Sequence, residues 1–109
     1  MLILRSDPTG QPASLALSGS LTIYEVKQAH DEIRAALAAG ERHWQLDLSE
    51  LEELDSAGAQ LLLALQRHLH GLDGQLDVRN PGDAVLELLE LLHLQSLYPD
   101  LLPASPEER

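Results

Sequence analysis

The spacing of the apolar residues changes back and forth along this 109-residue chain, and this feature limits the possible folds most strongly. Across residues 14–21, Leu and Gly alternate with Ser and Ala, a spacing of two that is typical of a β-strand with one buried face. From Val26 to Leu37 the apolar residues recur every three or four positions, as in an amphipathic helix. Both spacings return further along the chain. The resulting order, β-β-α-β-α-β-α, predicts an α/β fold.

The first two strands are expected to form a hairpin. Residues 2–5 are a short apolar run, and the Asp-Pro-Thr-Gly sequence at 7–10 favours a turn, because Pro fixes φ and Gly accepts a positive φ. The helix that follows is expected to begin with a capping box, in which Thr22 and Glu25 satisfy each other's backbone N–H groups. Gly40 is expected to end this helix.

A third strand of about six residues is predicted around residues 44–48, where Trp and Leu alternate with polar residues. The acidic stretch at 49–54 is expected to be a connector. A Leu-rich helix is then predicted to open at Asp55, to run to about His70 and to end near Gly71.

The C-terminal part is predicted to contain a short strand at 76–78 and a last helix, with Asn80 as its N-cap and Pro81 in its first turn. One face of this helix carries Val85, Leu88, Leu89 and Leu92. Three further leucines either close the core or contribute to a docking or dimer surface: Leu86, Leu94 and Leu97.

These elements predict one domain of residues 1–98. The later β-α-β units require parallel pairing, and right-handed crossovers place the connecting helices on one face of a small mixed β-sheet. Residues 99–109 are rich in Pro and Glu and are expected to be a flexible acidic C-terminal tail.

Charge and composition limit the function classes. The formal net charge of −11 repels phosphate backbones and anionic membranes, so neither nucleic acid nor a membrane surface is an expected partner. The absence of cysteine excludes disulfides, thiolate zinc sites and cysteine nucleophiles. The apolar run after Met1 is too short for a signal peptide or a membrane span. A soluble, cytoplasmic protein is expected.

The most informative residues lie where the Leu-rich helix begins. Asp55 suits the N-cap, and Ser56 would then be the first helical residue, exposed at the mouth of the loop. Gly58 would let another chain approach the helix start closely. A phosphate on Ser56 would meet free N–H groups but also an acidic rim, so its main effect would fall on a partner. The alternative is an ordinary capped helix without regulation.

The sequence from Asp47 to Leu62, with Leu54-Asp55-Ser56-Ala57-Gly58 at its centre, resembles the signature of STAS domains, which include bacterial anti-sigma factor antagonists and the cytoplasmic domains of sulfate transporters. The resemblance extends over nearly the whole chain. It implies a small mixed β-sheet flanked by helices. It also implies that Ser56, after the motif aspartate Asp55, is phosphorylated by a partner kinase that binds the unmodified form. The chain departs from many members at Ala57, where a second Ser is common.

The sequence therefore predicts a regulatory interaction module, similar to an anti-sigma factor antagonist, in which phosphate on Ser56 weakens partner binding. The expected contact residues are Asp55, Ser56, Ala57 and Gly58. An anti-sigma factor with serine kinase activity is the implied partner, and the protein is expected to be a monomer or weak dimer. The alternative is an accessory STAS subunit that is never phosphorylated and docks on an ABC lipid-transport ATPase or a chemotaxis signalling complex.

Catalysis is not expected. A serine hydrolase needs Gly-x-Ser-x-Gly, but Leu54 occupies the first glycine position, and no glycine-rich phosphate loop is present. His68 and His70 stand two residues apart and therefore point to different sides of a helix. We therefore expect no catalytic residues, no metal and no cofactor.

Overall fold

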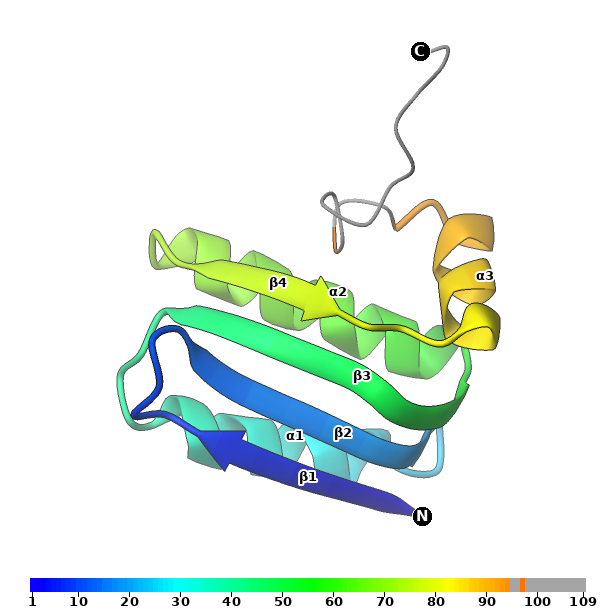
Figure 1. Cartoon of the computed structure of the whole chain (residues 1–109), viewed down its shortest axis with the longest axis horizontal. Helices are drawn as coiled ribbons and strands as arrows, with labels where there is room; N and C mark the ends of the chain where they lie inside the picture. Colours follow the sequence, from blue (N-terminus) through cyan, green and yellow to red (C-terminus); the bar gives the residue numbers. More distant parts are fainter. Residues whose placement is uncertain (95–96, 98–109) are drawn as a thin grey trace, which may run out of the picture.

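The computed structural model describes residues 1–94 and residue 97, and this part of the chain folds into four strands and three helices in the predicted order (Figure 1). The strands are β1 (Leu2–Asp7), β2 (Ala13–Leu21), β3 (His43–Leu54) and β4 (Gln75–Arg79). The helices are α1 (Val26–Leu37), α2 (Ser56–Gly71) and α3 (Asp83–Leu91). The predicted tail at 99–109 lies outside the described residues.

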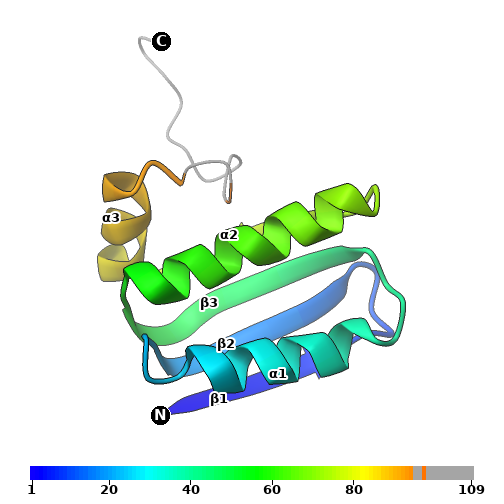
Figure 2. The ribbon, with the colours of Figure 1, turned by 180° about the vertical axis from the view of Figure 1, so that it is seen from behind.

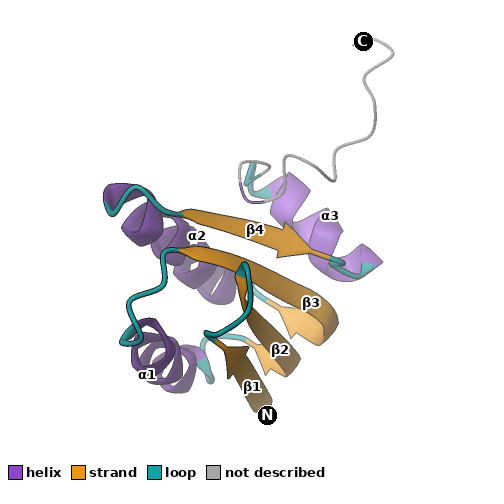
Figure 3. Cartoon of the chain, turned by 60° about the vertical axis from the view of Figure 1, so that its left-hand side comes forward, coloured by secondary structure: helices purple, strands orange, loops and turns teal. Residues whose placement is uncertain are grey.

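The strands form one mixed sheet in the order β1-β2-β3-β4. β1 runs antiparallel to β2, as the expected hairpin requires, whereas β2, β3 and β4 are parallel to one another. α1 and α2 connect the parallel strands and cover the same face of the sheet (Figure 2). α3 lies apart from them, near the carboxyl ends of β3 and β4 (Figure 3). The predicted α/β class, with helices mainly on one face, is confirmed.

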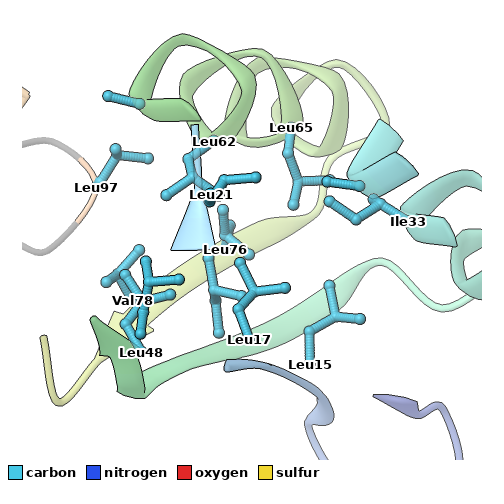
Figure 4. Close-up of a cluster of buried hydrophobic side chains, with 14 of the residues drawn as sticks. Leu15, Leu17, Leu21, Ile33, Leu48, Leu62, Leu65, Leu76, Val78 and Leu97 are labelled. Atoms are coloured by element: carbon cyan, nitrogen blue, oxygen red, sulfur yellow. The ribbon is translucent and has the colours of Figure 1, made fainter. Parts of the chain in front are cut away.

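The core lies between the sheet and the two connecting helices, and its side chains are almost entirely aliphatic (Figure 4). Alternate residues of the central strands point toward the helices; the fully buried ones include Leu15, Leu17, Leu46 and Leu48. Trp44 is 1% exposed, and its ring N–H donates to the Glu41 carbonyl at 3.0 Å. Burial of these alternating side chains fixes which face of each strand meets the helices.

β3 is about twice as long as the sequence predicted, because the acidic stretch at 49–54 is not a connector but the second half of the strand. This half pairs with the end of β2. Two register shifts each add one residue to β3, so the buried side chains of Leu48 and Leu51 lie three positions apart. Such bulges interrupt the spacing of two, and the sequence pattern therefore missed the end of the strand.

The start of α1 also differs from the prediction. Its N-cap is Glu25, and only one half of the expected capping box forms. The backbone N–H and the hydroxyl of Thr22 both donate to the Glu25 carboxylate, at 2.9 and 2.6 Å. The N–H of Glu25 donates to the backbone carbonyl of Thr22 instead of its hydroxyl.

α3 begins after Gly82, not after Asn80. Asn80 has a φ of +57°, a left-handed conformation that Asn tolerates better than most residues but that is not the extended geometry of an N-cap. Further on, Leu94 and Leu97 are 7% and 0% exposed, so they close the core and do not form a docking surface. Leu86 is half-buried and packs against the same core.

Candidate functional site

The start of α2 is fixed by the side chain of Asp55. Its backbone is extended, and Oδ1 accepts a hydrogen bond from the Gly58 N–H at 2.9 Å. Its carbonyl accepts the Ala59 N–H, also at 2.9 Å. The first of these bonds satisfies an N–H group that a helix start otherwise leaves free, and the second is the first intrahelical bond of α2. The N-cap predicted for Asp55 is therefore confirmed.

The second carboxylate oxygen of Asp55 connects α2 to the loop between β2 and α1. Oδ2 accepts a hydrogen bond from the backbone N–H of Ile23 at 2.9 Å. The backbone N–H of Asp55 in turn reaches the carbonyl of Leu21, at the end of β2, at 3.4 Å. The ends of β2 and β3 and the starts of two helices thus meet around one residue.

Gly58 is buried, and its missing side chain serves the fold itself. A β-carbon at this position would lie 2.2 Å from the Leu21 carbonyl oxygen and 2.8 Å from a methyl carbon of Leu54. The first turn of α2 can therefore approach the end of β2 only because residue 58 is glycine. The sequence predicts that a partner chain approaches Gly58 closely, whereas in the structure β2 occupies this position. Contact of Gly58 with a partner stays a prediction.

Ser56 is exposed, as the sequence predicted, and is the first residue of α2. Within the part of the chain that the structure describes, its hydroxyl makes no hydrogen bond. The hydroxyl stands at the positive end of the helix dipole, where negative charge is favoured. A phosphate could be added here without breaking a contact of the described fold.

Two exposed apolar residues lie next to this helix start and were not found from the sequence. Tyr24 is 90% exposed and Ile23 is 62% exposed. The bond between Ile23 and Asp55 holds this loop beside Ser56. We use the name Ser56 surface for Ile23, Tyr24 and Ser56 together with the half-buried Asp55 and Ala57. The sequence signal that could have identified Ile23 and Tyr24 is that two large apolar residues stand together in a loop, where they do not face the core.

The rim of the Ser56 surface is acidic. Glu50, Glu52 and Glu53, on the strand that leads into Asp55, are exposed and form no ion pair with any residue the structure describes. Behind the loop, hydrogen bonds from the Thr22 hydroxyl and backbone N–H hold the pKa of Glu25 below its ordinary value. A new negative charge at Ser56 would therefore join an already negative neighbourhood.

Within residues 1–94 and residue 97, no three His, Asp or Glu side chains come together as metal ligands would. In the same part of the chain, no helix combines the length and apolar composition that a membrane crossing requires.

Comparison with the models of known protein families gives a match over most of the chain. The family model described as "Mlab, STAS domain" matches residues 4–103, which is nearly the whole chain. The chain belongs to the STAS domain family. The resemblance inferred from the residues around Leu54 to Gly58 is thereby confirmed.

Individual relatives agree with this assignment. This STAS domain is 29% identical, over 83 residues, to the putative anti-sigma factor antagonist BtrV of Bordetella bronchiseptica; the match covers 76% of this chain and 72% of BtrV. An anti-sigma factor antagonist from Mycobacterium paratuberculosis has the same fold, with a TM-score of 0.80, 22% identity, and coverage of 91% and 84%. The anti-sigma factor antagonist SpoIIAA in its unphosphorylated form matches with a TM-score of 0.73, 22% identity, and coverage of 97% and 91%.

Proposed function

We propose that this STAS domain is a non-catalytic interaction module of the anti-sigma factor antagonist kind, switched by phosphorylation of Ser56. One observation carries the proposal: the Ser56 hydroxyl is exposed and takes no part in the described fold, yet the helix start around it is firmly held. The name of the Bordetella relative supports this function class. The matched SpoIIAA structure, described by its unphosphorylated form, supports phosphorylation as the type of control.

In the unmodified state, the partner contacts the Ser56 surface. Ile23 and Tyr24 supply apolar area that is free in the isolated chain, and aromatic side chains of this kind often anchor interfaces. The partner class is an anti-sigma factor with serine kinase activity. It transfers the terminal phosphoryl group of ATP to Oγ of Ser56 and releases ADP and a proton. This reaction needs ATP, so the proposal places the pair in the cytoplasm.

In the phosphorylated state, the fold persists and the contact is lost. The phosphate adds a charge of about −1.5 to −2 at pH 7, which the helix start tolerates because its N–H groups and dipole favour anions. The partner surface meets this charge together with Asp55 and the acidic end of β3. Repulsion and loss of close packing then release the partner.

The test combines the purified protein with a candidate anti-sigma kinase and ATP. Mass spectrometry should detect one added phosphate on the wild type and on Ser49→Ala, which removes another exposed serine, but none on Ser56→Ala. Binding of Ser56→Asp to the partner should be at least about tenfold weaker, or about 1.4 kcal/mol. Phosphate on Ser56→Ala, or full affinity of Ser56→Asp, would contradict the proposal.

A second candidate is an accessory subunit that docks on an ABC lipid-transport ATPase or a chemotaxis signalling complex without phosphorylation. This candidate stays open because the description of the matching family model names Mlab and does not name an anti-sigma factor antagonist. Affinity purification from cells separates the two candidates. Recovery of a transporter ATPase or of chemotaxis proteins, with equal yields for wild type, Ser56→Ala and Ser56→Asp, would favour docking.

A further inference from the structure

A groove of about 450 Å³ lies between α1 and α2. Its apolar lining includes Leu61 and Leu65 of α2, and Ile33 of α1 lies opposite (Figure 4). This groove and the Ser56 surface are formed by different residues, with the groove further along both helices.

The polar side chains that line the α1–α2 groove include one permanent positive charge, although the chain carries a net charge of −11. These side chains are His30, Arg34 and His68; no acidic side chain among the described residues lines the groove, although the Asp31 carboxylate lies 3.7 Å from the His30 ring. Arg34 supplies a permanent positive charge and forms no ion pair within the described part of the chain. The groove therefore fits an apolar surface with acidic edges.

The outer face of α3 is such a surface. Its core-facing side is buried, but Ala84, Leu88 and Leu91 form a stripe at helical spacing beside the buried face; Ala84 and Leu91 are exposed, and Leu88, which the sequence pattern places on the core face, is half-buried. Leu91 is 70% exposed. Glu87 and Glu90 lie along one side of the stripe, away from the core, are exposed, and have no ion-pair partner among the described residues.

We propose that the α1–α2 groove of one copy binds α3 of a second copy. Leu88 and Leu91 would enter the apolar groove, and Glu87 and Glu90 would face Arg34. The α3 of the same chain packs on β3 through its buried side, near the carboxyl ends of the strands, and does not line this groove. Each copy carries both surfaces, so the contact either closes into a dimer that makes it twice or extends head to tail.

The contact is small, so the association is expected to be weak. A groove of this size receives about two turns of helix, well below the area of a standard stable interface. We expect a dissociation constant on the order of 10⁻⁴ M for one contact. Sedimentation velocity over a range of protein concentrations measures this association directly and gives its stoichiometry.

Charge reversal tests the pairing. Arg34→Glu gives the groove a negative charge, and Glu87→Lys with Glu90→Lys makes α3 basic, so each variant alone should stay monomeric. A mixture of the two variants should associate, because each groove then meets an α3 of opposite charge. The second variant also reduces the net negative charge of the chain. General repulsion would therefore predict stronger self-association for it, opposite to our expectation.

Matched controls separate this contact from general charge effects and from misfolding. Arg5→Glu makes the same charge change at an exposed position on β1 and should associate like the wild type. Leu91→Ser removes an exposed anchor and should abolish association while the circular dichroism spectrum and melting temperature stay unchanged. The proposal is overturned if the wild type is monomeric up to about 1 mM, or if the mixture of charge-reversed variants stays monomeric. A monomeric wild type would leave the groove open to an acidic helix of another protein.

Discussion

The starts of α2 and α3 are built in opposite ways. At α2 the N-cap side chain of Asp55 bonds both to the helix and to a neighbouring loop, and Gly58 is wedged against β2. At α3 the N-cap is Gly82, which has no side chain to cap the helix, and among the described residues no atom outside its chain neighbours lies within 4 Å of the position of its missing β-carbon. α3 is held by apolar burial further along the helix, at Val85 and Leu89.

This difference bears on function. A helix start that depends only on burial further along the helix leaves its first residues with few fixed neighbours. A helix start bonded to two other segments presents its exposed side chain in one place, which a recognition site requires. Ser56 begins the helix whose start is bonded to two other segments. Asp83, the first residue of α3, begins the helix whose start depends on burial further along. The same substitution made at both starts therefore tests how far they differ.

Glycine to alanine should give the largest contrast. In Gly58→Ala the new methyl group would meet the backbone of Leu21, which cannot move without disturbing β2, so we expect a loss of about 3 kcal/mol of unfolding free energy. Gly82→Ala meets open space and should cost less than about 1 kcal/mol. Urea unfolding of both variants measures the difference. Equal losses of unfolding free energy in the two variants would mean that the close approach of α2 to β2 does not require glycine at position 58.

Removal of the aspartate at each helix start, Asp55 for α2 and Asp83 for α3, should give the next largest difference in unfolding free energy. Asp55→Ala loses the N-cap bond and the bond to Ile23, and should cost about 2 kcal/mol. Asp83→Ala loses only a favourable charge in the first turn, worth about 0.5 kcal/mol. Asp55→Asn should lie between, because its amide keeps one acceptor oxygen. If Asn matched Ala, the negative charge of Asp55 would matter more than its hydrogen bonds.

Much of this architecture was predictable because it is local. The order of strands and helices follows from changes of apolar spacing, and the N-cap at Asp55 follows from residue type and position. The missed features depend on contacts distant in sequence. The bulges of β3 exist through its pairing with β2, and Gly58 is needed because of the Leu21 carbonyl, 37 positions earlier. Ile23 and Tyr24 join the site through a bond to a residue on another element.

The start of α1 differs from the other two helix starts because the stability that its Glu25 carboxylate provides should depend on pH. The Thr22 hydroxyl, and then its backbone N–H, lower the pKa of Glu25. A carboxyl whose pKa is lower in the folded state stabilises the fold above its unfolded pKa, and this stabilisation is lost as the pH falls through the folded pKa. Unfolding free energy should therefore decrease below about pH 4.3, and Glu25→Gln should flatten this part of the curve.

The hydroxyl of Thr22 can be tested separately by NMR titration of the carboxyl groups. Thr22→Val should raise the pKa of Glu25 toward its ordinary value, whereas Thr22→Ser should not. Asp7 is the internal control, because Thr9 lowers its pKa at a distant turn, and its titration should be the same in all three proteins. An unchanged Glu25 titration in Thr22→Val would show that the backbone N–H alone holds the carboxylate.

The smallest effect is expected at Ser56, between the two most sensitive positions. Its hydroxyl is exposed and has no hydrogen bond in the described fold, so Ser56→Ala should change the unfolding free energy by less than about 0.5 kcal/mol. Ser56→Asp should behave similarly, because the helix dipole favours the new charge while Asp55 opposes it. Urea unfolding beside Asp55→Ala measures both. A cost above about 1 kcal/mol would make the hydroxyl part of the fold. With no such cost, any loss of partner binding at Ser56 must arise at the contact itself.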